Sequence, residues 1–139
     1  MAHRDHSNLQ QLPREVYSDI DLAFLSHPIT GKLTRKINRE AVKQSVKSLI
    51  MTDYYERPFK SDIGCGIRAL LFENFHPAIT QQMEDAIREV ISNYEPRASI
   101  RNVHIVGKPD SNELNVTVVF FTRNDPTPIT LDVLLERVR

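Results

Sequence analysis

Few residues in this sequence combine a reactive side chain with the neighbours that covalent chemistry requires. Cys65 is the single cysteine, and no histidine or basic residue stands directly beside it to stabilise a thiolate. We therefore expect a small buried thiol rather than a nucleophile. Gly64 and Gly66 permit a positive φ or a close backbone approach, but they do not form a phosphate-binding loop. A lone cysteine also excludes an intramolecular disulfide and leaves a cysteine-rich metal site incomplete.

The histidines offer little more. His3 and His6 could bind a metal together, but both belong to residues 1–15, a polar segment that we expect to be a flexible arm. His27 precedes Pro28 in a predicted turn, and we interpret it as a loop residue rather than a catalyst. We therefore expect neither a cofactor nor a metal.

Four cations recur at three- and four-residue spacing and would follow one line along a helix: Lys36, Arg39, Lys43 and Lys47. Two interpretations remain open. The stripe is either a solvated helix face or a surface that docks on an acidic region of a partner subunit. Nucleic acid is a poorer candidate, because no aromatic side chains are interleaved with the cations.

The overall charge excludes broad classes of partner. Eighteen basic and 18 acidic side chains cancel, so no net field steers the chain to nucleic acid or to an anionic membrane. No apolar run approaches the length of a membrane span, and the N-terminal residues lack the apolar core of a signal peptide. We therefore expect protein partners, without nucleic acid or membrane.

The longest amphipathic segment runs from His76 to Arg97, and we expect the rest of the chain to be arranged around it. Its apolar residues recur at helical intervals and form one stripe: Ile79, Met83, Ala86, Ile87, Val90, Ile91 and Tyr94. Pro77 suits the first helical position. Pro96 disfavours the α conformation of the preceding residue, so the helix is predicted to end near Asn93 or Tyr94.

Shorter elements are predicted upstream. A helix should begin at Asn38, which would act as its N-cap, and end near Met51. Its buried stripe would consist of Val42, Val46, Leu49 and Ile50. A short helix should follow from Ile67 to about Asn74. Partial alternation over residues 16–25 predicts a short strand with one solvent-facing side.

The last third of the chain alternates apolar and polar residues with a period of two. Three strands are predicted, and their apolar faces consist of Val103 and Ile105, then Leu114, Val116, Val118 and Phe120, then Ile129, Leu131, Val133 and Leu135. Loops at 107–112 and 124–128 would make them an antiparallel meander. Val119, Phe121 and Leu134 are apolar on the opposite face, which leaves either a second layer of helices or a surface for another chain.

Together these elements predict an α+β fold, in which a small antiparallel sheet of three to four strands packs against about three helices. With 139 residues, of which 40% are hydrophobic, the chain can form one domain with a modest core. We expect residues 16–139 to be that domain.

A series of short segments, taken in order, resembles a known family. They are Asp19–Phe24, Ala41–Val46, Arg57–Phe59, Gly64–Cys65, Leu71–Asn74 and Asn93–Arg97. They are similar to the baseplate wedge and sheath-initiator proteins of contractile-tailed bacteriophages, nearest to the T-even type. Related proteins occur in type VI secretion and other contractile injection machines, and the family is often labelled lysozyme-like. The resemblance covers roughly residues 16–138.

The resemblance implies a structural subunit of the virion's tail baseplate, assembled in the host cytoplasm. Its partners would be other baseplate wedge subunits, the tail tube protein beside it and the tail sheath protein. It would bind the helical core bundle of the wedge. Its last strand, with Ile129, Leu131, Val133 and Leu135, would template the sheath by strand exchange.

The same resemblance assigns the contact with the wedge bundle to Glu95, Pro96 and Arg97. Pro96 fixes the direction of the chain, and Arg97 can present a planar fork of donors to carboxylate or carbonyl oxygens. By spacing alone, the triplet is instead a helix stop with an internal contact between Glu95 and Arg97. The resemblance favours the partner contact.

The lysozyme-like label raises an alternative, the cleavage of peptidoglycan by paired carboxylates. That chemistry needs one acid with a raised pKa and a second carboxylate roughly 5–5.5 Å or 6.5–9.5 Å away. The candidates are Glu73, Glu95, Asp62 and Glu56. None stands in a recognisable catalytic context, and the absence of tryptophan leaves little material for a sugar-stacking cleft. We therefore expect a non-enzymatic protein.

Overall fold

The computed structural model describes residues 14, 16–73, 76–108 and 113–136. Apart from Arg14, the predicted arm of residues 1–15 lies outside the described residues, and so do His3 and His6. The loop predicted at 107–112 is described only as far as Lys108.

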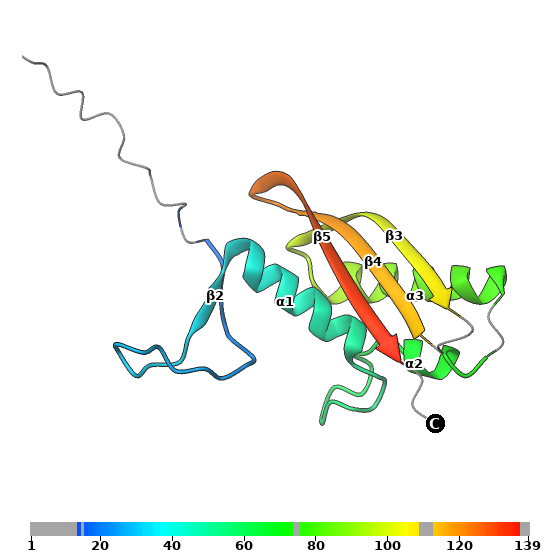
Figure 1. The fold of residues 1–139 in the computed structure, drawn as a ribbon, viewed down its shortest axis with the longest axis horizontal. Coiled ribbons are helices and arrows are strands. Elements are labelled where there is room, and N and C mark those ends of the chain that lie inside the picture. The colour runs from blue at the N-terminus through cyan, green and yellow to red at the C-terminus, as the bar shows by residue number, and fades with distance from the viewer. Residues whose placement is uncertain (1–13, 15, 74–75, 109–112, 137–139) are drawn as a thin grey trace, which may run out of the picture.

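The described residues form three helices and two antiparallel sheets, so the α+β prediction is confirmed (Figure 1). The helices are α1 (Asn38–Met51), α2 (Ile67–Leu70) and α3 (Pro77–Tyr94). A two-stranded sheet pairs β1 (Ser18–Ile20) with β2 (Arg35–Ile37). The main sheet has the order β3 (Ala98–Lys108), β4 (Glu113–Thr122) and β5 (Asp125–Glu136).

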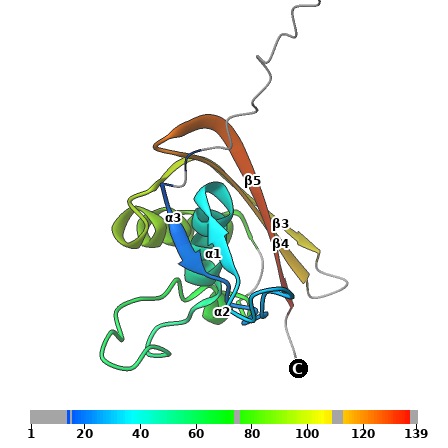
Figure 2. The ribbon, with the colours of Figure 1, turned by 90° about the vertical axis from the view of Figure 1, so that its left-hand side faces the viewer.

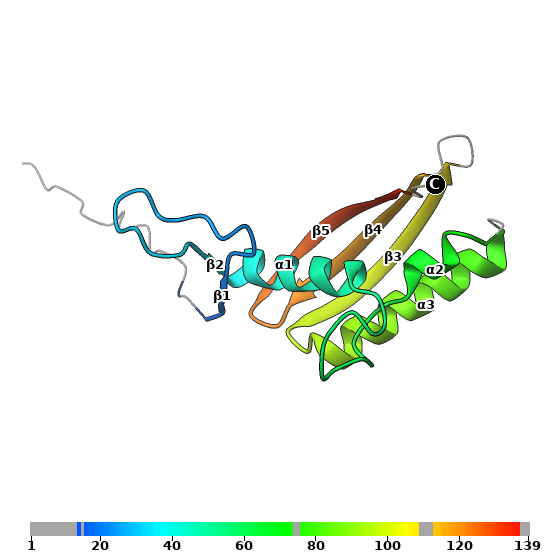
Figure 3. The ribbon, with the colours of Figure 1, turned by 90° about the horizontal axis from the view of Figure 1, so that it is seen from below.

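One face of the main sheet carries the core. Helix α3 packs against β3 and helix α1 packs against β5, and the two helices also contact each other (Figures 2 and 3). All ten predicted core residues of the strands are buried, and Phe120, Val116 and Val118 are fully buried. They meet Met83, Ile87 and other residues of the predicted α3 stripe. Fully burying one such side chain stabilises the fold by about 1.5–3 kcal/mol.

The opposite face of the sheet has no helix over it in the described part of the chain. Leu134 is exposed there, while Val119 and Phe121 are partly buried. The upstream helix lies on the same face as α3. Among the described residues, the second layer of helices is therefore not found on this face, and the surface for another chain stays a prediction.

Strand β5 begins earlier than predicted. The sequence placed residues 124–128 in a loop, whereas β5 starts at Asp125 and includes Pro126 and Pro128. An edge strand tolerates proline because one of its sides has no ladder hydrogen bonds to donate. The strand predicted over residues 16–25 is conversely reduced to Ser18–Ile20.

Asn38 does not cap α1, and this prediction was wrong. The N-cap position is Ile37, which makes no side-chain capping bond. The side-chain carbonyl oxygen of Asn38 instead accepts hydrogen bonds from the backbone N–H groups of Val16, at 2.9 Å, and Tyr17, at 3.2 Å. Its amide nitrogen donates to the carbonyl of Arg14 at 3.0 Å. The side chain thus holds the incoming chain against the start of the helix.

Candidate partner-binding surfaces

Two residues of the Glu95-Pro96-Arg97 triplet, Glu95 and Arg97, belong to a partly buried ion-pair cluster. The Arg97 guanidinium donates from Nε to Glu95 Oε1 at 2.7 Å and from Nη2 to Glu95 Oε2 at 2.8 Å. It also donates to both carboxylate oxygens of Asp19, at 3.3 and 3.1 Å, and lies 5.4 Å from the ring centroid of Tyr17. We call Asp19, Glu95 and Arg97 the clasp. It connects the end of α3 to β1.

At Glu95, burial and ion pairing have opposite effects on the pKa of the carboxyl group. Burial by itself would raise the pKa of this carboxyl group, because only 2% of the residue is exposed. Hydrogen bonds from Arg97 and Ser45, together with the Arg97 charge, outweigh that effect and hold the pKa of Glu95 below its ordinary 4.5. Hydrogen bonds to Glu95 and Asp19 raise the pKa of Arg97. Glu95 and Arg97 are therefore both ionised at neutral pH.

The local sequence accounts for the placement of the clasp. Helix α3 ends as predicted, and Glu95 closes it by donating its N–H to the Ile91 carbonyl at 2.8 Å. The chain then turns directly into β3, and Ala98 N–H donates to the Glu95 carbonyl at 3.1 Å. Pro96, at the turn, is exposed to solvent. Two backbone hydrogen bonds hold the corner, which presents Pro96 outward.

The internal contact predicted from the spacing of Glu95 and Arg97 is confirmed. Sequence reasoning did not identify Asp19 and Tyr17 as part of the same cluster. Asp19 is 78 residues from Arg97, and no local pattern connects the two. The one signal in the sequence was the position of Asp19, which is the first residue of the first segment that resembles the family.

The four cations of the predicted basic stripe lie on two elements. Lys36 lies in β2 and pairs with Asp21 at 3.4 Å. Arg39, Lys43 and Lys47 lie on α1, and Lys47 is exposed. Arg39 Nε lies 3.6 Å from Asp125 Oδ2, and Arg39 Nη2 donates to the Pro128 carbonyl at 3.4 Å.

Two members of the stripe do meet the predicted template strand. A groove of about 720 Å³ lies between α1 and the first half of β5, and its lining includes Arg39, Lys43, Pro128, Ile129 and Thr130. We call it the strand groove. The side chains of Ile129, Leu131, Val133 and Leu135 point into the core and are at most 5% exposed. Any contact of β5 with another chain therefore has to use its backbone or its outward side chains.

A second groove, of about 490 Å³, lies beside the clasp. Its walls are the β1–β2 hairpin, with Asp19, Ile20 and Leu22, and the loop of residues 52–63, with Arg57 and Lys60. We call it the hairpin groove. Its floor includes Ser45, Ser48 and Leu49 of α1, and Tyr94 of α3.

The 52–63 loop is held to the core by the Gly64-Cys65-Gly66 segment. Cys65 N–H donates to the Thr52 carbonyl at 2.9 Å. Gly64 lies so close to the backbone of residues 53–54 that an added Cβ would stand 2.6 Å from Asp53 C and Tyr54 N. Gly66 has a φ of +61°. Both predicted uses of glycine, a positive φ and a close approach, are therefore confirmed here.

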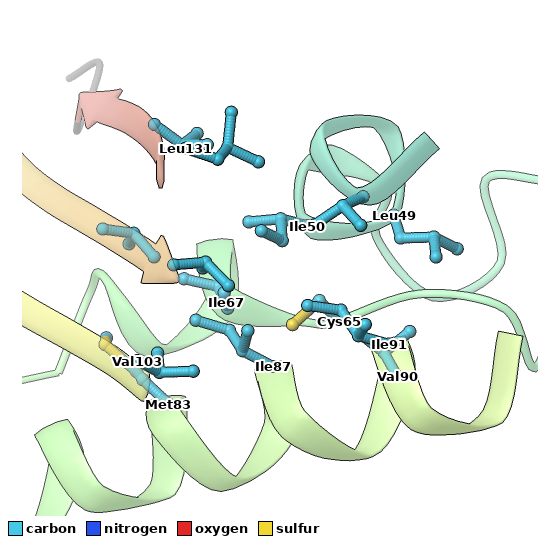
Figure 4. Close-up of a cluster of buried hydrophobic side chains, with 14 of the residues drawn as sticks. Leu49, Ile50, Cys65, Ile67, Met83, Ile87, Val90, Ile91, Val103 and Leu131 are labelled. Atoms are coloured by element: carbon cyan, nitrogen blue, oxygen red, sulfur yellow. The ribbon is translucent and has the colours of Figure 1, made fainter. Parts of the chain in front are cut away.

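Cys65 is a buried thiol, as predicted. It lies among Ile50, Ile87 and Ile91 in the core (Figure 4). Burial and the nearby negative charge of Asp53 raise the pKa of the thiol to about 12. A thiol with such a pKa is neither a nucleophile nor a metal ligand at neutral pH.

The four carboxylates considered for hydrolysis differ in burial and in pairing. Glu95 is held ionised by Arg97, whereas a general acid needs a raised pKa. Glu56, Asp62 and Glu73 are exposed and lack the burial on which such an acid relies. Within the described ranges, no group of three histidine, cysteine, aspartate or glutamate side chains could hold a metal ion. No helix among the described residues is long and apolar enough to cross a membrane.

Comparison with known proteins places this geometry in context. Residues 37–127 match the model of a protein family described as baseplate wedge protein gp25. The baseplate wedge protein gp25 of Enterobacteria phage T4 is 30% identical over 115 residues, which are 83% of this chain and 86% of that protein.

Two solved structures share the fold. A candidate tail lysozyme from Geobacter sulfurreducens has a TM-score of 0.65 at 21% identity, covering 72% of this chain and 91% of its own. A chain in the baseplate of the anti-feeding prophage has a TM-score of 0.61 at 23% identity, covering 85% and 83%. At these identities the likeness establishes the fold alone.

Proposed function

This chain belongs to the family of baseplate wedge protein gp25, and from that premise we propose that its clasp is the corner by which it binds the core of the wedge. The chain is a baseplate wedge protein of a contractile tail or a related system, and its place is the tail baseplate. We propose that its role there is structural and not enzymatic, and that it assembles in the host cytoplasm.

The geometry of the clasp is the observation that carries this proposal. Its ions fix the backbone of Pro96 in one orientation, and three exposed residues at the end of α3, Ser92–Tyr94, lie on the same corner. A preorganised corner loses little conformational entropy when it binds a partner. The Arg97 guanidinium has five N–H groups, and the clasp uses four of them. One donor therefore remains for a carbonyl or carboxylate of the wedge bundle.

Arg97→Lys tests the role of the clasp in binding. Lysine keeps a positive charge beside the buried Glu95, but it cannot bridge two carboxylates and a partner in one plane. We expect the affinity for the co-expressed wedge subunits to fall by about tenfold or more, in a domain whose circular dichroism is unchanged. Arg101→Lys is the matched control, because Arg101 lies over Phe121, outside the clasp. Equal wedge binding by both variants would remove the clasp from the interface.

We further propose that β5 is the strand on which the sheath starts, through its backbone. We call the free edge of β5, on the side away from β4, its outer rim. Pro128 has no N–H, and its carbonyl accepts a hydrogen bond from Arg39 of α1. We therefore assign the main-chain groups of Pro128 to the outer rim. Main-chain groups in an antiparallel ladder alternate between the partner and the opposite side. The register of β5 with β4 is uninterrupted from Ile129 to Glu136. Thr130, Asp132 and Leu134 therefore share that rim.

The other edge of the sheet, β3, is less suited to strand addition. Its register with β4 shifts between Ile100 and Asn102, which marks a bulge. A bulge twists an edge and interrupts the regular row of donors and acceptors that an added strand needs. The register of β5 with β4 also shifts, between Phe120 and Thr122, but it is continuous over the eight pairs from Ile129 to Glu136, against seven pairs from Asn102 to Lys108 in β3. The proposal for β5 rests on this longer regular stretch.

Thr130→Pro tests the template strand. The substitution removes one rim N–H while leaving the core side chains of β5 in place, so a strand can no longer add across that position. We expect tails whose tubes carry no sheath when this variant replaces the wild-type chain. Thr130→Ala, which keeps the N–H, should give normal sheathed tails. Sheathed tails from the proline variant, counted by negative-stain electron microscopy, would overturn the role of β5.

The basic stripe remains a proposal as a partner-facing surface, now limited to α1. Arg39 and Lys43 line the strand groove beside the start of β5, where they could receive acidic residues of an added strand. Lys36 is paired with Asp21, and Lys47 is exposed. Among the other partners, we propose the tail tube protein as a neighbour in the assembled baseplate.

A further inference from the structure

We propose that the hairpin groove receives a helix of a wedge subunit, with an apolar stripe toward the hairpin and at least one carboxylate toward Arg57 and Lys60. This inference rests on the proposed role of the clasp, because the groove includes Asp19 in its wall. It goes further by assigning the form and the chemistry of the segment that binds beside the clasp.

The hairpin wall is unusually apolar for a solvent-exposed segment. Large apolar side chains between β1 and β2 are all more than half exposed: Ile20, Leu22, Phe24, Leu25, Ile29 and Leu33. Single exposed apolar residues are ordinary, but a contiguous set in one short hairpin marks an interaction site. Ile20 and Leu22 of this set line the groove itself.

The backbone of the hairpin disfavours an extended strand at Ile20 and Leu22. Gln44 of α1 donates from its amide nitrogen to the Ile20 carbonyl at 2.9 Å and accepts from Leu22 N–H at 3.1 Å. One side chain thus satisfies both main-chain groups that a strand entering here would need. The occupant has to be recognised by side chains. A helix, whose backbone groups are satisfied internally, meets that requirement.

The opposite wall provides positive charge. Arg57 makes a hydrogen bond to Ser48 Oγ at 3.4 Å, and neither Arg57 nor Lys60 has a carboxylate partner among the residues that the structure describes. The one acidic side chain in the lining, Asp19, is already bound to Arg97. The groove therefore complements a helix that carries acidic residues beside its apolar stripe.

Three exposed aromatic residues on the same hairpin and the same loop, outside the lining of the groove, support a binding role. Phe24 on the hairpin, and Tyr55 and Phe59 on the loop, all have a positive φ, of 51°, 69° and 67°. Their exposed fractions are 66%, 84% and 106%, so packing within the chain does not compensate for these backbone conformations. Bulky residues held in this strained region are typical of binding sites. We expect them to contact the flanks of the bound helix.

The test is a double charge reversal, Arg57→Glu with Lys60→Glu, measured against the purified complex of wedge subunits encoded with this chain. We expect the dissociation constant to rise about tenfold or more, and the wild-type affinity to fall as salt is added. Arg88→Glu with Arg101→Glu is the matched control, since it makes the same change in net charge outside the groove and the clasp. Its affinity should stay within about twofold of wild type. If the double variant loses its folded circular dichroism, Lys60→Glu alone, at an exposed position, is measured in its place.

A cross-link identifies the occupant. A photoreactive residue at position 59 should label an acidic amphipathic helix of a wedge subunit, whereas one at position 106, on the far face of the sheet, should not. Wild-type affinity in the charge-reversed variant, combined with loss of binding in Arg97→Lys, would overturn this inference and leave the wedge role standing. Wild-type affinity in both variants would overturn both. Labelling of an extended segment or of the sheath protein at position 59 would also overturn the helix assignment.

Discussion

Arg97→Ala is expected to lower the free energy of unfolding by about 3–5 kcal/mol, the range for breaking a buried ion pair from one side. The substitution leaves the Glu95 carboxylate, which is 2% exposed, without its main donor. Asp19 loses the same partner and can move into solvent, because 34% of its side chain is already exposed. The cost is therefore concentrated at Glu95. It is a large part of the roughly 5–15 kcal/mol that stabilises an ordinary domain.

The pH dependence identifies the cause. In the wild-type chain the pKa of Glu95 is lowered by folding, so its contribution is complete above the ordinary value of 4.5 and is lost as the pH falls through the lower, folded value. Without Arg97, burial instead raises the folded pKa of Glu95 above 4.5, so protonation favours the folded variant. The difference in stability between the two proteins should be largest near neutral pH. It should shrink steadily as the solution is made acidic.

Urea unfolding at a series of pH values measures both effects. Arg97→Ala combined with Glu95→Gln should recover part of the loss, since a neutral amide costs less to bury than an unpaired carboxylate. Arg101→Ala is the control, and it should lower the free energy of unfolding by much less than Arg97→Ala does. A pH-independent loss, or no recovery in the double variant, would show that the clasp does not stabilise the chain as an ion pair.

Gly64→Ala is expected to be the second severe substitution, with a loss of about 3 kcal/mol from overpacking against backbone that cannot rotate away. An added Cβ would meet Asp53 C and Tyr54 N at 2.6 Å, and Asp53 O at 2.8 Å. Gly64 has no positive φ, so the effect is a collision rather than a conformational preference. Displacing residues 53–54 would also shift the 52–63 loop, and with it one wall of the hairpin groove.

Gly31→Ala separates the two possible effects of a lost glycine. Gly31, on the hairpin, has a φ of +63°, but nothing lies within 4 Å of the position that an added Cβ would take. Alanine there should cost about 1–2 kcal/mol from the left-handed backbone alone. Thermal unfolding of the two variants gives the comparison. If Gly64→Ala lowered the stability less than Gly31→Ala, the 52–63 loop would have to move easily. One wall of the hairpin groove would then not be fixed.

The sheet and the long helix could be predicted because their signals are local and repeated. Val116, Val118 and Phe120 alternate with partly or fully exposed neighbours along β4, and all three are buried. Pro77 and Pro96 mark the ends of α3 within one or two residues. These patterns arise because one face of each element is buried, so the order of apolar and polar residues is enough to predict the element.

The clasp and the hairpin could be predicted only in part, because they depend on contacts between distant segments. The spacing of Glu95 and Arg97 indicated their contact, but Asp19 joins them only through the path of β1 around α1. Asn38 was assigned as a helix cap from its type, yet its side chain binds the backbone of residues 16–17. The positive φ of Tyr55 and Phe59 contradicts the preference of bulky residues, so no propensity predicts it.

The most direct measurement is a cryo-electron microscopy reconstruction of the assembled baseplate that contains this chain. We predict a helix of a wedge subunit against the Pro96 corner and the hairpin groove, and a strand of the sheath protein along the rim of Thr130, Asp132 and Leu134. A reconstruction in which the corner, the groove and this rim all face solvent would contradict the proposed role.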